Sequence, residues 1–141
     1  VCRLQVCGRF TWVAGAVGGR AAAGGWHGGG IVNVSSRASQ IGAAGEYIDY
    51  AASKGAVESL TVGLAKEVAE EGIRVNAVRP GFIYTEMHAS GGEPDRVDRV
   101  KAFTPMKRGG SAAEVANAIL WLLSEDASYT TGAFIDVSGG R

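Results

Sequence analysis

From residue 31 onward, two patterns of apolar and polar residues alternate along the chain. Short apolar runs bounded by turn residues predict strands buried on both faces, as in parallel sheets, at residues 31–35, 73–78 and 133–137. Between these runs, apolar residues recur at spacings of three and four, which predicts helices over residues 49–71 and 111–124. This order of strands and helices predicts an α/β fold, with about three strands in a parallel, doubly wound sheet and helices flanking it.

The ends and faces of the predicted helices can also be placed. Gly72 suits the position just past the first helix, and Ser111 with Glu114 forms a capping box at the start of the second. The first helix has an apolar stripe that we expect to face the core, made of Val57, Leu60, Leu64 and Val68. A second face holds only small residues, namely Ala52, Ala56, Ser59 and Gly63. This second face either packs closely on the sheet or contacts another subunit, and the sequence favours neither.

Residues 1–30 differ in composition from the rest of the chain. They contain nine glycines, two of the three tryptophans and three arginines, but no Lys, Asp or Glu. They show almost no helical or strand periodicity, and they lack the Ser- or Pro-rich composition of most linkers. We therefore divide the chain into an atypical Gly-rich segment, residues 1–30, and a domain, residues 31–141. We expect the first segment to be disordered or to come from a shifted reading frame.

Composition and charge narrow the function classes. The 14 basic and 14 acidic residues balance, which gives no indication of a nucleic-acid or membrane-surface partner. No apolar run approaches the ~20 residues of a membrane span, and glycines interrupt the one candidate for a secretory signal, residues 12–17. Cys2 and Cys7 form neither a CxxC pair nor a cluster with histidine, so we expect free thiols and no metal site. These features predict a cytoplasmic protein.

Three residues form a candidate site for general acid–base catalysis. Tyr50 and Lys54 are four residues apart near the start of the first helix, so their side chains share one face. A free phenol is a poor acid or base at neutral pH, but a neighbouring ammonium group favours the phenolate and makes proton transfer feasible. Ser36 follows the first strand, at the edge where open α/β sheets bind ligands. Its hydroxyl can hold a substrate oxygen against the tyrosine.

Two neighbouring residues are alternatives to members of this set. Ser35 also precedes the loop, but side chains alternate along a strand, and we prefer Ser36. Tyr47 has no lysine four residues later, so we expect it to line the substrate side of the site or to pack.

Three other features are interpreted as structural. We expect His88 to be an exposed loop residue, with a substrate contact as the alternative. Charges of both signs at helical spacing in residues 95–101 predict a solvated helix face and no binding patch. Trp121 lies in the second helix and is expected to pack.

Four segments together resemble the short-chain dehydrogenase/reductase family, especially members described as glucose dehydrogenase-like or 3-oxoacyl-carrier-protein reductase-like. They are residues 31–36 (IVNVSS), 50–55 (YAASKG), 73–81 (IRVNAVRPG) and 131–140 (TGAFIDVSGG). The resemblance implies that the chain holds the C-terminal half of a Rossmann-type domain. It also implies an NAD(P)-dependent oxidoreductase that interconverts small-molecule alcohols and carbonyl compounds. Family members are typically homotetramers or homodimers.

The resemblance further implies roles for single residues. Ser36 would orient the reacting oxygen, Tyr50 would transfer the proton, and Lys54 would assist Tyr50 and hydrogen-bond the nicotinamide ribose. The cofactor-binding residues of this chain would be Tyr50, Lys54, Pro80, Gly81, Ile83 and Thr85. Residues 86–92 would belong to a lid over the substrate. Hydride transfer itself would be the chemistry of the cofactor.

The family's Gly-rich phosphate-binding turn has no counterpart in this sequence. Residues 14–21 resemble it only superficially, because no apolar strand of proper length precedes them and no helical pattern follows. We therefore expect a truncated form of the enzyme whose isolated chain is unstable or binds no NAD(P)H. The alternative is a non-catalytic fragment or an association module. The sequence leaves the substrate, and the choice between NAD and NADP, open.

Overall fold

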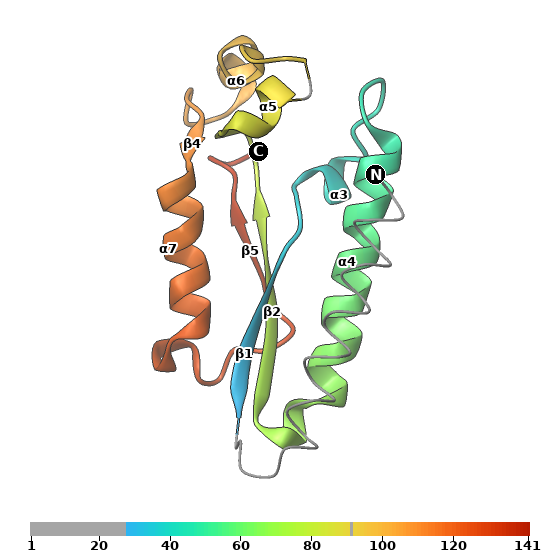
Figure 1. The fold of residues 1–141 in the computed structure, drawn as a ribbon, viewed down its shortest axis with the longest axis vertical. Coiled ribbons are helices and arrows are strands. Elements are labelled where there is room, and N and C mark those ends of the chain that lie inside the picture. The colour runs from blue at the N-terminus through green and yellow to red at the C-terminus, as the bar shows by residue number, and fades with distance from the viewer. Residues whose placement is uncertain (1–27, 91) are drawn as a thin grey trace.

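The structure, a computed structural model, describes residues 28–90 and 92–141 (Figure 1). The predictions for Cys2, Cys7 and residues 14–21, and most of the segment 1–30, lie outside the described residues. The three predicted strands are present as β1 (Gly29–Val34), β2 (Ile73–Pro80) and β5 (Phe134–Val137).

These strands form one parallel sheet in the order β1-β2-β5. Ile31 of β1 pairs with Val75 of β2, and Ala77 of β2 pairs with Phe134 of β5. Most side chains of the central strand β2 are buried, because helices cover both faces of the sheet, and this explains its mainly apolar sequence. The predicted α/β fold with a parallel sheet is confirmed.

Two long helices cover the sheet, α4 (Ile48–Glu67) on one face and α7 (Ala112–Leu123) on the other (Figure 1). The core beneath α4 consists of Ala65, Val68, Ile73 and Val75, with Ile31 and Leu64 packed against it. The predicted capping box of α7 is confirmed. The Glu114 N–H donates to Ser111 Oγ (3.2 Å), and the Ser111 N–H donates to the Glu114 carboxylate (2.8 Å).

The first helix differs from its prediction in its end and in one face. α4 ends at Glu67, and a separate 3-10 turn, η1 (Ala69–Glu71), leads to Gly72. Gly72 has a φ of 72°, in the left-handed region that favours glycine, so its predicted role in ending the helical segment holds. The small-residue face is exposed to solvent, so the interpretation that it packs on the sheet is wrong; it consists of Ala52, Ala56, Ser59 and Gly63.

Several short elements connect the strands and long helices. The helix α3 (Ala38–Ile41) lies between β1 and α4, and the turn η3 (Glu125–Ala127) follows α7. The segment between β2 and α7 contains β3 (Ile83–Tyr84), α5 (Glu86–Ser90), α6 (Arg96–Val100), η2 (Lys101–Phe103) and β4 (Gly110–Ser111). β3 and β4 pair in parallel as a small second sheet that the sequence did not predict. This segment lies beyond the carboxyl ends of β2 and β5 (Figure 1).

Candidate active site

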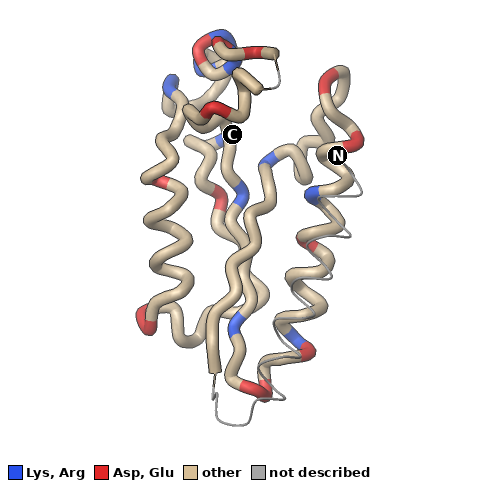
Figure 2. The backbone as a smooth tube through the Cα atoms, viewed as in Figure 1, with Lys and Arg blue, Asp and Glu red and all other residues tan. Residues whose placement is uncertain are grey.

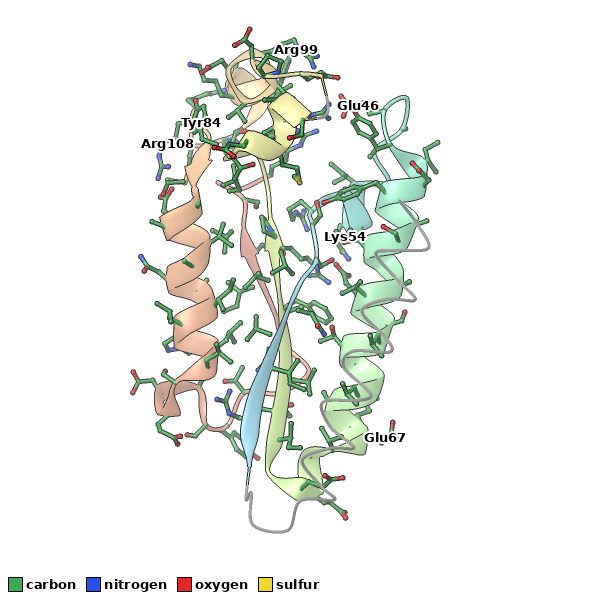
Figure 3. The ribbon with its side chains drawn as sticks, viewed as in Figure 1. Glu46, Lys54, Glu67, Tyr84, Arg99 and Arg108 are labelled. Atoms are coloured by element: carbon green, nitrogen blue, oxygen red, sulfur yellow. The ribbon has the colours of Figure 1, made fainter. Side chains whose placement is uncertain are left out.

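Tyr50 and Lys54 lie in the first two turns of α4, beside the carboxyl end of β1. Only 4% of Lys54 is exposed, and its Nζ donates a hydrogen bond to the carbonyl oxygen of Val34 (2.9 Å). The same Nζ lies 5.5 Å from the centre of the Tyr50 ring. Figure 3 shows Lys54 between α4 and the end of β1. The ammonium group is thus held by the strand backbone next to a half-buried phenol.

Ser36 begins the turn that leaves β1. It is half-buried, and its Oγ accepts a hydrogen bond from the N–H of Ala38 (3.1 Å). Its carbonyl oxygen lies 2.7 Å from Ser39 Oγ, which donates to it. Because Ser36 Oγ accepts from the backbone, its O–H can donate to a bound oxygen atom. Ser36 follows Val34, whose carbonyl holds Lys54, by two residues, so the turn brings the predicted serine, tyrosine and lysine to one end of the sheet.

Ser35, the alternative to Ser36, points the other way. It is 2% exposed, and its Oγ donates to Glu58 Oε1 (2.8 Å) and lies 3.4 Å from the carbonyl oxygen of Lys54. Its hydroxyl is therefore engaged between β1 and α4. This placement favours Ser36 as the serine that meets a substrate.

Glu58, which was not predicted from the sequence, makes hydrogen bonds with several elements at this end of the molecule. Arg79 binds its carboxylate with two hydrogen bonds, Nε to Oε1 at 2.7 Å and Nη2 to Oε2 at 2.8 Å. Gln40 donates to Oε2 (3.0 Å), and Ser39 Oγ also hydrogen-bonds Oε1. Burial opposes ionisation of Glu58, but the hydrogen bonds from Arg79, Ser39 and Ser35 outweigh it and lower its pKa to about 2. The one available signal was its position four residues after Lys54, on the sheet-facing side of the helix.

Glu58 also makes the stability of the chain depend on pH. A carboxyl group with a folded pKa of about 2 and an ordinary value of 4.5 stabilises the folded state above pH 4.5, and this contribution is lost as the pH falls toward 2. We expect Glu58→Gln to lower the free energy of unfolding at pH 7 by up to ~3 kcal/mol, with the difference from wild type shrinking between pH 4.5 and pH 2. Urea unfolding at a series of pH values measures it.

The matched control is Glu67→Gln, an exposed carboxylate near the end of the same helix. Its free energy of unfolding should stay within about 0.5 kcal/mol of the wild-type value at each pH, since surface substitutions usually change stability little. A Glu58→Gln deficit that stays constant across this pH range would contradict the prediction.

The residues predicted to hold the nicotinamide follow β2, at the same edge of the sheet as Ser36. Pro80 ends β2, and the Gly81 N–H donates to the carbonyl oxygen of Val137 (3.0 Å). A Cβ on Gly81 would lie 2.8 Å from the Cα of Ser138, so the chain just after β5 approaches too closely for any other residue. Ile83 is buried and Thr85 is exposed. The contacts of these residues with a cofactor stay a prediction.

Arg96 links the segment between β2 and α7 to the start of α4. Only 9% of Arg96 is exposed, so the predicted solvated face of residues 95–101 is wrong at this position. Its guanidinium group forms ion pairs with Glu46 and Glu93 and lies 5.1 Å from the centre of the Tyr47 ring. Charged residues gather on α5, α6 and their flanks (Figure 2). Arg96 can be buried because these partners, including Glu46 from another part of the chain, compensate its charge.

Two other structural interpretations need correction. His88 is half-buried in α5, and its Nε2 lies 3.0 Å from the carbonyl oxygen of Ile83, so it is not an exposed loop residue. Trp121 is 43% exposed on α7, so it does not pack fully in the core. Leu122 occupies that position instead and is completely buried.

The last residues of the chain also reach this edge. Arg37 Nε donates to the carbonyl oxygen of Arg141 (2.7 Å), and the Arg141 guanidinium group lies 4.4 Å from the centre of the Phe82 ring. A cavity of about 230 Å³ opens beside Phe82 and is lined by residues of the β3–β4 region and the end of β5, among them Met106 and Asp136. Ser36, Tyr50 and Lys54 do not line it.

Two kinds of feature are absent from residues 28–90 and 92–141. No group of three or more His, Cys, Asp or Glu side chains in this part of the chain is arranged to hold a metal ion. No helix within the same residues has the length and apolar character needed to cross a membrane.

Comparison with known proteins places the chain among oxidoreductases. A family model described as Enoyl-(Acyl carrier protein) reductase matches residues 10–141. The uncharacterized oxidoreductase YgfF of Escherichia coli (strain K12) is 64% identical over 141 residues, which cover 100% of this chain and 57% of that protein. Glucose 1-dehydrogenase of Gluconobacter oxydans (strain 621H) is 44% identical over 112 residues, 79% of this chain and 42% of that protein. The chain spans about half the length of these relatives.

Solved structures give the same result. The promiscuous reductase LugOII, which catalyses keto-reduction at C1 during lugdunomycin biosynthesis, matches with a TM-score of 0.81 and 34% identity, over 97% of this chain and 52% of that chain. A putative 2-deoxy-D-gluconate 3-dehydrogenase from Agrobacterium tumefaciens with bound NADP matches with a TM-score of 0.70 and 35% identity, over 80% of this chain and 46% of that chain. The family model and YgfF also match within residues 1–30, and the division at residue 30 stays a prediction.

Proposed function

The chain belongs to the short-chain dehydrogenase/reductase family of oxidoreductases, and from that premise we propose that it carries the proton-transfer site of an NAD(P)-dependent enzyme for small alcohols or carbonyl compounds. The observation that supports this most directly is the placement of Lys54. Its buried ammonium group is anchored on Val34 and lies beside the Tyr50 ring, at the strand end that leads into Ser36. A cation held beside a phenol at the ligand-binding edge of a parallel sheet suits general acid–base catalysis.

In the direction of reduction, the carbonyl carbon gains a hydride and its oxygen gains a proton. The Ser36 hydroxyl donates a hydrogen bond to the substrate oxygen and holds it at the phenol of Tyr50. Tyr50 gives its proton to that oxygen as the alkoxide develops. Lys54 stabilises the resulting phenolate, because its ammonium group is already in place and poorly hydrated. In oxidation, the same groups act in the reverse order.

The nicotinamide cofactor, NAD or NADP, supplies or accepts the hydride when bound. The residues at the carboxyl end of β2 fit such a group. The backbone at Gly81 runs close against Ser138, with Pro80 before it and Ile83 and Thr85 after it, along the edge that carries Ser36. These residues would hold the carboxamide side, and Lys54 would hold the ribose. The NADP-bound relative supports a nicotinamide dinucleotide as the cofactor class.

The proposal is tested on the purified 141-residue chain. Titration with NADH and NADPH, followed by fluorescence, measures cofactor binding. Loss of reduced-nicotinamide absorbance with a panel of ketones, aldehydes, keto-sugars and acyl thioesters measures turnover. Saturable binding with turnover supports the proposal and overturns the expectation, drawn from the sequence, that the isolated chain is unstable or binds no NAD(P)H. Absence of both in the folded chain contradicts it and supports the alternative function described next.

The alternative is a non-catalytic fragment or association module, and two observations favour it. The small-residue face of α4 is exposed, which allows close approach of another helix, and β1 is an edge strand of the described sheet. Sedimentation of the chain, alone and mixed with YgfF, tests this function. Stable homo- or hetero-oligomers without cofactor binding would support it, and a monomer that turns over substrate would exclude it.

A further inference from the structure

We propose that Glu58 is a positioning residue, which with Arg79 sets the placement of Ser36 relative to Lys54. The inference rests on the proposed function, since it concerns the same site. Glu58 lies one turn after Lys54 on α4, and its carboxylate receives hydrogen bonds from three other elements. These are the end of β1 through Ser35, the helix α3 through Ser39 and Gln40, and the end of β2 through Arg79.

The first connection runs from Glu58 to Ser36. Ser39 Oγ shares its hydrogen between the Glu58 carboxylate and the carbonyl oxygen of Ser36, which is 2.7 Å away. Ser35, the residue before Ser36, donates to Glu58 at 2.8 Å. The carboxylate therefore holds the Ser36 backbone from both sides. The turn that presents the Ser36 hydroxyl, marked by the hydrogen bond from Ala38, is built on these contacts.

The second connection runs from Glu58 to Lys54. Ser35 Oγ lies 3.4 Å from the carbonyl oxygen of Lys54, and Lys54 Nζ donates in turn to Val34. Residues 34–36 and residues 54–58 are thus joined at both ends of the Lys54 side chain. A shift of β1 along α4 would break these contacts, so they keep Ser36 in register with the Lys54 ammonium group.

Arg79 fixes the other side of the carboxylate. Its guanidinium group lies 4.2 Å from the centre of the Phe134 ring and 3.6 Å from Asp136, and Asp136 pairs with Arg37 at 3.2 Å. Arg37 directly follows Ser36. The ion pair is therefore linked to the turn by a second route that passes through β5.

This arrangement suits positioning better than stability. A buried ion pair costs desolvation energy, and apolar residues of similar volume often stabilise a fold at least as well. Removing one partner alone is destabilising, as expected above for Glu58→Gln, but what the pair adds over apolar residues is fixed geometry at atoms next to Ser36 and Lys54. Small displacements of reacting groups can cost about 10²-fold in rate. We therefore expect loss of the pair to act on turnover more than on cofactor binding.

The test compares Glu58→Gln, Arg79→Met and the double variant in the full chain, with Glu67→Gln as the control. Glu58→Gln keeps the side-chain shape but removes the charge. We expect it to lower kcat by ~10- to 100-fold, with the KM for NAD(P)H changed less than about threefold. Arg79→Met should act similarly, and the double variant should lose less than the product of the two single losses. Equal losses in Glu67→Gln, or a rise in KM with unchanged kcat, would overturn the proposal.

A second readout does not depend on turnover. The Ala38 amide donates to Ser36 Oγ, so its hydrogen exchange reports the placement of that hydroxyl. We expect Glu58→Gln to speed exchange at Ala38 at least tenfold, while the Gly81 amide, bonded to Val137, keeps its protection relative to global unfolding.

If Glu58→Gln does not fold, Ser39→Ala, which breaks one link only, should show the same change. Unaltered Ala38 exchange in a folded variant would overturn the inference. If the wild-type chain showed no turnover but the variants still showed these exchange changes, that result would contradict the proposed function alone.

Discussion

Tyr50→Phe is expected to lower kcat by about 10³-fold, within the ~10²- to 10⁴-fold range typical of a general acid or base. The substitution removes one oxygen atom from a half-buried ring and leaves the ring beside the Lys54 ammonium group, at the 5.5 Å separation seen in the structure. Cofactor binding should stay within about twofold, because the ring remains in place. Steady-state turnover and fluorescence titration of NAD(P)H, on the same preparations, measure the two quantities.

Tyr129→Phe is the matched control, since Tyr129 is fully exposed near the start of the loop before β5, at the far end of the sheet. It should behave as wild type. Tyr47→Phe tests the rival tyrosine, whose ring lies against Arg96, and should lose far less turnover than Tyr50→Phe. If Tyr50→Phe kept more than a tenth of the wild-type kcat, or if Tyr47→Phe lost as much, Tyr50 would not be the proton donor.

The strands and the main helices could be predicted from sequence because local patterns determine them. A buried parallel strand is mainly apolar, as Ile73–Val78 is apart from Arg74 and Asn76, and the Ser111 capping box is complete within four residues. The placement of Tyr50 beside Lys54 is equally local, since helix geometry brings residues four apart onto one face. These features need no knowledge of the tertiary contacts.

The ion pairs could not be predicted in this way, because their partners are distant in sequence. Arg79 meets Glu58 only when β2 lies beside α4, and Arg96 meets Glu46 only when α6 folds over the start of that helix. From its neighbours in sequence, Arg96 was predicted to lie on a solvated helix face, and that prediction is wrong. His88 was misread for a related reason: its partner, the carbonyl of Ile83, is only five residues away, but Ile83 lies in a short strand that forms by pairing with the more distant β4.

The choice between Ser35 and Ser36 shows a middle case. Strand alternation predicts that the two side chains point to opposite sides, but it does not say which side faces α4. The structure answers this through Glu58, which takes the Ser35 hydroxyl and leaves Ser36 on the turn. A sequence pattern can therefore name the pair of candidates, and a single long-range contact favours one of them.

Lys54→Met is expected to lower kcat/KM by ~10²- to 10³-fold, which corresponds to losing one well-placed charge at a buried site. Methionine approximates the length and volume of the lysine stem, so the change removes the ammonium group while largely preserving packing between α4 and β1. The loss has two parts. The phenolate of Tyr50 forms without a cation beside it, and the hydrogen bond to the Val34 carbonyl disappears.

We expect the affinity for NAD(P)H to fall about tenfold as well, in contrast to Tyr50→Phe, if Lys54 also holds the ribose. Steady-state kinetics and cofactor titration separate these effects.

Lys66→Met is the control, because Lys66 lies on the same helix three turns later and is exposed. It should keep wild-type turnover and cofactor affinity. Lys54→Arg retains the charge but replaces a compact ammonium group with a larger planar one, so in this 4% exposed position it should recover only part of the activity. A Lys54→Met variant that lost turnover only in proportion to its folded fraction would show that the ammonium group stabilises the end of β1 without taking part in proton transfer. A loss of kcat at an unchanged folded fraction, restored in part by arginine, requires the charge itself at the Tyr50 phenol.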